Sequence, residues 1–175
     1  MVATPASASG PERTRLTLRG ALKAGELLVL SYHDIRDEVA ERGDPDAYAV
    51  STQNFAAHLD WLSAHGYHPV SLSQLITASK GGTPLPPKPV LLTFDDGPSA
   101  LHNDRVLDIL DERGIKATFF FVGVYAQLRP DLVREAASRG HNVACHSWSH
   151  PTTLPGWGAA AQEAQVRRCF EALEA

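Results

Sequence analysis

The sequence has no long apolar run and no cluster of basic residues. Its longest apolar stretches, such as 27–30, are far shorter than the roughly 20 residues that a membrane-spanning helix needs. Its 16 Lys and Arg residues are outnumbered by 20 Asp and Glu residues, so the formal net charge is −4. No basic stripe is present to match a phosphate backbone. We therefore expect no transmembrane segment and no nucleic-acid partner.

Cysteine is also scarce, and the first residues lack an apolar core. Cys145 and Cys169 are too few for a disulfide framework, and Cys145 lies in an apolar strand-like run, which favours two buried free thiols. Residues 1–25 combine small and polar residues with arginines, unlike a signal peptide. We expect them to form a flexible N-terminal segment ahead of a single domain over residues 26–175.

What the sequence does contain is one pattern that occurs three times: an amphipathic segment, then a glycine, then a strand-like run. Each glycine stands where a helix needs a left-handed residue at its C-terminal end. Helices and strands that alternate in this way predict a parallel sheet or barrel. The three copies are 55–65, Gly66 and 67–70; 106–113, Gly114 and 115–122; and 132–139, Gly140 and 141–145.

Further elements complete an α/β domain. The apolar runs 27–32 and 90–94 are typical of strands buried on both faces. Residues 80–89 are rich in glycine and proline and predict a surface connector. A last helix is expected from about Ala159, with an apolar face that consists of Val166, Cys169, Phe170 and Leu173.

Polar residues follow three of the predicted strands. In parallel α/β folds the C-terminal strand ends lie on one face, where active sites are built, so we expect these residues to converge. They are His33 and Asp34 after the first strand, Asp95 and Asp96 after 90–94, and His146 and His150 after 142–145.

The types and spacing of these residues predict a metal centre. His146 and His150 are four residues apart and can point the same way across one turn. One carboxylate beside them completes a three-ligand site that leaves room for water and substrate. Asp95 and Asp96 are adjacent, so their side chains should diverge, one toward the metal and the other toward the bound water. Two histidines and one aspartate suit zinc, cobalt, nickel or iron.

Two motifs carry a family resemblance. TFDDG at 93–97 and HSWSHP at 146–151 resemble, in order and separation, the first two motifs of the NodB-type polysaccharide deacetylases, carbohydrate esterase family four. The resemblance implies that Asp95 is the catalytic base and that Asp96, His146 and His150 are metal ligands. The upstream segments SYHDI and YAVSTQNFAAHLDWLSAHGYHPVS resemble the N-terminal region of bacterial poly-N-acetylglucosamine deacetylases.

The resemblance implies a fold and an activity. The fold is a distorted (β/α) barrel of the NodB type. The activity is metal-dependent hydrolysis of N-acetyl groups from N-acetylglucosamine-containing polysaccharide, which is chitin-like, peptidoglycan or poly-N-acetylglucosamine. Zinc is the first candidate metal, and the expected location is the cell envelope or the exterior. No protein partner is indicated.

The later motifs of the family are not found after Pro151. These are an Arg-x-Pro-aromatic segment, a further Asp and a Leu-x-His, so the general acid has no candidate. We therefore expect a domain that is truncated on its C-terminal side. An inactive glycan-binding or scaffolding fragment with the metal site is the alternative. A two-histidine, one-carboxylate iron oxygenase fits the ligands but not the α/β order or the second aspartate.

Several residues have a structural alternative. Both DDG and paired histidines occur in ordinary turns and loops, but the two motifs together favour the metal site. His33 is interpreted as substrate-binding, with a structural histidine as the alternative. Trp148 either lines a sugar-binding groove or packs beside the metal loop. Structural roles are expected for His58, His65, His68, His102 and His141.

Overall fold

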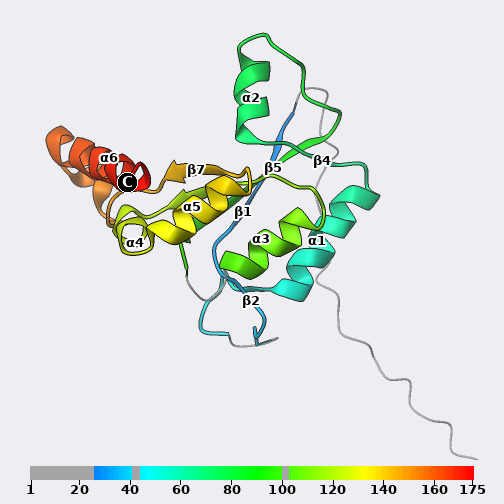
Figure 1. The fold of residues 1–175 in the computed structure, drawn as a ribbon, viewed down its shortest axis with the longest axis horizontal. Helices are drawn as coiled ribbons and strands as arrows, with labels where there is room; N and C mark the ends of the chain where they lie inside the picture. Colours follow the sequence, from blue (N-terminus) through cyan, green and yellow to red (C-terminus); the bar gives the residue numbers. More distant parts are fainter. Residues whose placement is uncertain (1–25, 41–43, 100–102) are drawn as a thin grey trace, which may run out of the picture.

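The computed structural model describes residues 26–40, 44–99 and 103–175. A five-stranded parallel sheet lies at its centre (Figure 1). The α/β class that the sequence predicts is confirmed. The N-terminal segment 1–25 and His102 lie outside the described residues. The strands follow the order β1 (Leu28–Tyr32), β5 (Pro89–Gly97), β6 (Thr118–Phe121) and β7 (Asn142–Cys145), with β4 (His68–Pro69) paired to the start of β5; β2 (Ile35–Arg36) and β3 (Val50–Ser51) form a separate pair.

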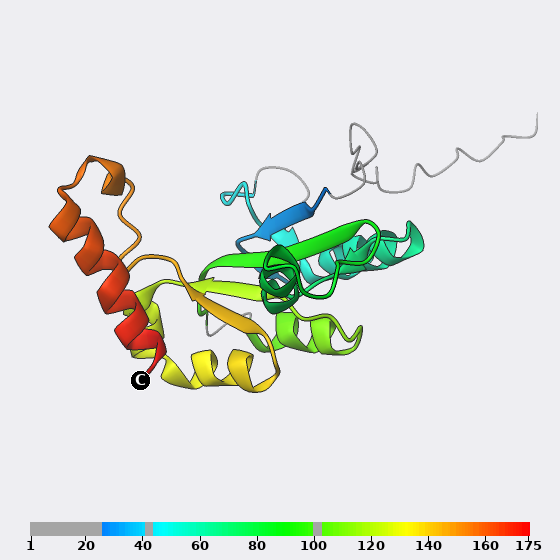
Figure 2. The same cartoon turned by 90° about the horizontal axis from the view of Figure 1, so that it is seen from above.

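Helices connect the strands and cover the sheet. Figure 2 shows α3 and α5 on the same side of the sheet and α6 beside its β7 end. No helix in the described part of the chain is long and apolar enough to span a membrane. The helices are α1 (Thr52–Ala64), α2 (Leu72–Ser79), α3 (Asn103–Asp111), α4 (Gly123–Leu128), α5 (Pro130–Ser138) and α6 (Ala159–Leu173), with a short 3-10 turn at Leu154–Gly156.

The three predicted helix–glycine–strand units are confirmed. Gly66, Gly114 and Gly140 follow α1, α3 and α5 with φ angles of +72°, +62° and +81°. A residue with a Cβ is strained in this left-handed region, so glycine favours the reversal there. The chain then enters β4, β6 and β7. The predicted connector 80–89 is likewise irregular up to the start of β5.

The two apolar runs differ in burial. Val90 and Leu92 of β5 are fully buried, and Phe94 stacks on Phe119 of β6 with ring centroids 4.8 Å apart. This confirms β5 as a buried strand. The prediction that 27–32 is buried on both faces is wrong, because β1 is an edge strand and Val29 is 51% exposed.

The last helix begins at Ala159 as predicted, but its buried stripe differs. Cys169 and Ala172 are buried, whereas Val166 and Phe170 are exposed. The predicted face is therefore wrong for these two residues. The reason is that α6 packs on α4 and β7 at one end of the sheet and does not lie across it (Figure 2).

The two cysteines form a disulfide, Cys145–Cys169, with Cα atoms 5.8 Å apart. The prediction of two free thiols is wrong. It was based on the number of cysteines and on the strand that carries Cys145, and neither indicates that α6 brings Cys169 against the end of β7. The disulfide joins α6 to the residue that directly precedes His146.

His141 is a buried polar residue at the start of β7, with an exposure of only 6%. Its Nδ1 accepts the backbone N–H of Ala117 at 3.2 Å, and its Nε2 has no partner in the described residues. Burial, aided by Lys116, lowers the pKa of the ring to about 4. The folded protein therefore holds this histidine neutral at pH 7.

We predict that His141 makes the protein acid-sensitive. An unfolded histidine has a pKa of about 6.5, so between pH 6.5 and pH 4 the unfolded state binds more protons. As the pH is lowered through this window, the contribution of His141 to the free energy of unfolding should fall by up to about 1 kcal/mol per pH unit. Above the window this contribution should stay constant. His141→Asn, which keeps an acceptor but cannot titrate, should reduce this slope in urea unfolding curves. An equal slope in both proteins would contradict the assignment.

Candidate metal centre

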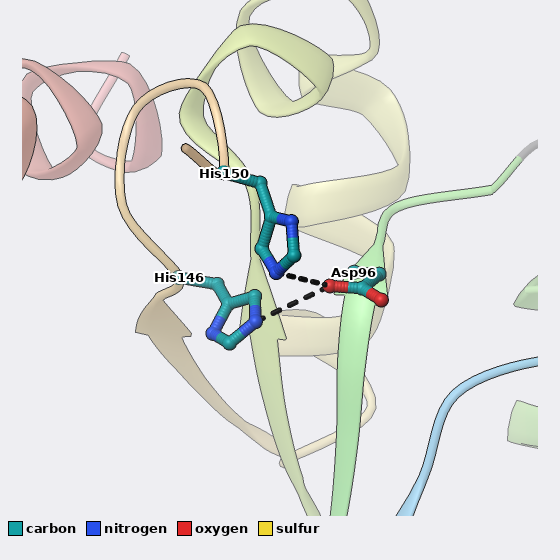
Figure 3. Close-up of side chains that lie close together, drawn as sticks. All are labelled: Asp96, His146 and His150. Atoms are coloured by element: carbon teal, nitrogen blue, oxygen red, sulfur yellow. Dashed lines mark ion pairs between the residues drawn. The ribbon is translucent and has the colours of Figure 1, made fainter. Parts of the chain in front are cut away.

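Asp96, His146 and His150 meet at the C-terminal edge of the sheet. Asp96 is near the end of β5, and the two histidines lie in the loop that follows β7, with both rings directed at Asp96 (Figure 3). The Oδ1 atom of Asp96 is 3.2 Å from His146 Nε2 and 3.3 Å from His150 Nε2. The predicted convergence of these three side chains is confirmed.

These distances suit a shared metal ion. One donor atom from each residue lies within 4.8 Å of the others. Ligands about 2.0–2.2 Å from a tetrahedral zinc ion are about 3.3–3.6 Å from one another, close to the two Asp96–histidine distances. The side chains are 44%, 30% and 50% exposed, in the order Asp96, His146, His150, so an ion could enter from solvent. Without an ion, the same contacts are carboxylate–imidazole pairs.

A β-bulge contains the two adjacent aspartates. Phe94 pairs with Phe119 and Gly97 pairs with Phe121, so β5 has one more residue than β6 between these two pairs. Asp96 adopts a φ of +69° there. Bulges of this kind redirect side chains.

Asp95 points to a different set of partners from those of Asp96. Its Oδ2 accepts a hydrogen bond from the Ser31 hydroxyl at 3.1 Å, and its Oδ1 is buried without a partner in the described residues. The predicted divergence of the two carboxylates is confirmed. Ser31 was missed by the sequence analysis, although it lies two residues before His33 and thus on the same face of the strand.

Asp95 lines a cleft at the C-terminal ends of β1 and β5. The enclosed part of this cleft has a volume of about 60 Å³ and opens to solvent. His33 and Asp34 line it too, so the strand-end residues of β1 and β5 do converge. Apolar side chains make up much of the remaining wall, which contains Ile35, Phe94, Val106, Phe119 and Phe121.

Ion pairs hold the segment beside His33. Arg36 bonds both Asp34 and Asp44. The hydrogen bond from Arg36 is the main reason that the pKa of Asp44 falls to about 2. The ring of Tyr48, an exposed residue, lies 5.0 Å from the His33 ring.

The remaining aromatic and histidine residues have structural contacts. Trp148 packs against the core, with the Arg168 guanidinium 4.1 Å from its ring, which supports the packing alternative. Away from the metal centre, His58 contacts Tyr32, while His65 and His68 bond backbone carbonyls. With His141 in the core, these four histidines take the structural roles that were expected.

Known proteins resemble this chain over much of its length. The family model for polysaccharide deacetylase matches residues 82–175, more than half of the chain. A chitooligosaccharide deacetylase of Sinorhizobium fredii is 42% identical over 102 residues, which cover 58% of this chain and 46% of the relative. A peptidoglycan-N-acetylglucosamine deacetylase of Bacillus cereus is 34% identical over 104 residues, which cover 59% of this chain and 38% of the relative. The chain thus spans less than half the length of these curated relatives.

Solved structures agree in fold. A de-N-acetylase of Aggregatibacter actinomycetemcomitans superposes with a TM-score of 0.62 at 28% identity, covering 70% of this chain and 55% of that one. A Streptococcus pyogenes deacetylase in complex with acetate gives a TM-score of 0.72 at 22% identity, covering 85% of this chain and 67% of that one. At that identity the second likeness concerns the fold alone.

We predict that each of the two histidines is needed for metal binding. His146→Ala and His150→Ala each leave two of three ligand atoms. We expect zinc affinity to fall by more than the roughly 10- to 100-fold typical of residues that only support a ligand. Competition with a chelating dye would measure the Kd. His68→Ala, which removes an exposed histidine bonded to the Pro87 carbonyl, is the matched control. Equal zinc affinity in all three variants would rule out this centre.

Proposed function

This chain belongs to the polysaccharide deacetylase family, and we propose that it hydrolyses N-acetyl groups of N-acetylglucosamine-containing glycans with a divalent metal ion held by Asp96, His146 and His150. The observation that carries the proposal is the divergence of the two aspartates. One carboxylate faces two histidines, whereas its neighbour lines a cleft, bonds Ser31 and has one buried oxygen that no described residue contacts through a hydrogen bond. A hydrolytic site needs this division between a ligand and a base.

Asp95, Ser31 and His33 have different roles in the proposed reaction. A bound divalent ion supplies Lewis acidity, which polarises the acetamide carbonyl and acidifies water. Asp95 takes a proton from the attacking water, and the Ser31 hydroxyl holds the other carboxylate oxygen in place. The proton on Asp95 is then available to the leaving amine, which completes the proton balance. His33, in the same cleft as Asp95, is proposed to contact the substrate.

Zinc is the metal we propose first. Two imidazole nitrogens and one carboxylate oxygen form a ligand set that zinc accepts in catalytic sites, with a position left for water or substrate. Cobalt, nickel and iron accept the same set.

The substrate class follows from the names of the relatives. Chitooligosaccharide and peptidoglycan both contain N-acetylglucosamine, and relatives named for each are 42% and 34% identical to this chain over the matched residues. We propose a location outside the cytoplasm, in the cell envelope or beyond it. The disulfide supports this location, because reducing cytosol disfavours such bonds.

We predict different losses for the two aspartates. Asp96→Asn should weaken zinc binding, because a neutral amide oxygen is a poorer ligand than a carboxylate. Asp95→Asn should keep zinc but lower kcat by about a hundred- to ten-thousandfold, because an amide cannot accept the proton of water. Acetate release from chitooligosaccharide and from peptidoglycan, measured beside bound zinc, tests both roles.

Three outcomes would go against the proposal. Full activity in the Asp95→Asn variant would show that Asp95 is not the base. Loss of zinc from Asp95→Asn with retention in Asp96→Asn would exchange the two roles. No acetate release from either glycan by the zinc-loaded wild-type protein would contradict the proposed hydrolysis.

A further inference from the structure

The loop that carries both histidines has a strained backbone. Ser147 and His150 have φ angles of +60° and +49°, in the left-handed region that residues with a Cβ seldom adopt. Such a conformation is unfavourable and persists only where neighbouring groups fix it. The spacing of the two imidazoles therefore depends on the contacts that hold the three residues between His146 and His150.

Gln165 of α6 holds this loop through its side-chain amide. Its Oε1 accepts the backbone N–H groups of Trp148 and of Ser149, each at 3.0 Å. Its Nε2 donates to the Ser149 hydroxyl at 3.1 Å. One half-buried side chain thus binds two consecutive peptide groups that lie between the ligands.

The opposite side of the loop rests on α4. The N–H groups of Gly123 and Val124 donate to the carbonyls of Ser147 and Trp148, both at 2.9 Å. A Cβ on Gly123 would lie 2.7 Å from the Trp148 ring and 2.9 Å from Cys169 Cα. Glycine therefore lets α4, the loop and α6 pack in direct contact.

The disulfide fixes the helix that carries Gln165. Cys169 lies one helical turn after Gln165 and is bonded to Cys145, which directly precedes His146. The distance between Gln165 and the start of the loop is thereby limited by a covalent bond. Because Gln165 and Cys169 belong to the same helix, the disulfide keeps the backbone of Gln165 close to the loop.

We propose that Gln165 is a positioning residue for the metal centre: by accepting the N–H groups of Trp148 and Ser149 it sets the spacing of His146 and His150 for a divalent cation. The inference rests on the proposed metal site and adds a residue that does not touch the ion. Residues that support ligands in this indirect way typically change metal affinity by about 10- to 100-fold when replaced.

Gln162 provides a matched control on the same helix. Its Nε2 donates to the carbonyls of Leu154 and Trp157, which lie beyond the metal loop. A glutamine that only stabilises the fold should behave like Gln162. A positioning residue should alter zinc affinity in addition.

The experiment compares the zinc Kd of the wild-type chain, Gln165→Met, Gln165→Glu and Gln162→Met, with thermal unfolding of each zinc-free protein. Methionine keeps the length of the side chain and removes the acceptor, so Gln165→Met should bind zinc at least about tenfold more weakly. Glutamate keeps an acceptor for both N–H groups and should bind zinc as tightly as the wild type. Gln162→Met should also match the wild type.

Two results would overturn the positioning role. The first is wild-type zinc affinity in a folded Gln165→Met protein. The second is a tenfold loss in a folded Gln165→Glu protein, which remains decisive if the methionine variant does not fold. Failure of the metal centre can be told apart from failure of the positioning role. If the metal centre is wrong, the wild-type chain will bind no more zinc than His146→Ala does, and both proposals will be wrong.

Discussion

The β-bulge at the end of β5 is the feature on which the whole site depends. In a regular strand, Asp95 and Asp96 would point to opposite faces of the sheet. The extra residue of the bulge, with Asp96 at a φ of +69°, changes the directions of the two carboxylates at the end of the buried part of β5. One meets the histidines after β7, and the other meets Ser31 of β1 and the cleft. Two neighbouring carboxylates thus have different contacts.

The sheet holds the two aspartates, and the helices α4 and α6 hold the loop that carries His146 and His150. β5 is held by β1 on one edge and by β6 on the other, which fixes the carboxylates. The histidine loop lies beyond the end of β7. It is held by hydrogen bonds from the backbone N–H groups of α4, by the side-chain amide of Gln165 and by the disulfide. The site is therefore built from a buried strand and a loop clamped by two helices.

Most of the fold could be predicted because local signals and global structure agree. Glycine marks three helix ends, and the apolar run 90–94 marks the central strand. The meeting of Asp96, His146 and His150 could be predicted as well, because the ends of β5 and β7 and the spacing of the two histidines point to the same edge of the sheet. The helix α2 was missed although Ser71 and Gln74 form a capping box that the sequence displays. The disulfide, the bulge and Gln165 depend on how α6 and β6 dock, and no local pattern encodes that docking.

The central claim is that Asp96, His146 and His150 hold a divalent cation beside Asp95. Crystals of the zinc-loaded protein, with diffraction recorded on both sides of the zinc absorption edge, would test it most directly. The account predicts one anomalous peak within about 2.0–2.2 Å of Asp96 Oδ1 and of a ring nitrogen from each histidine, with Asp95 outside the ligand set. A peak elsewhere, or a peak ligated by Asp95 in place of Asp96, would contradict it.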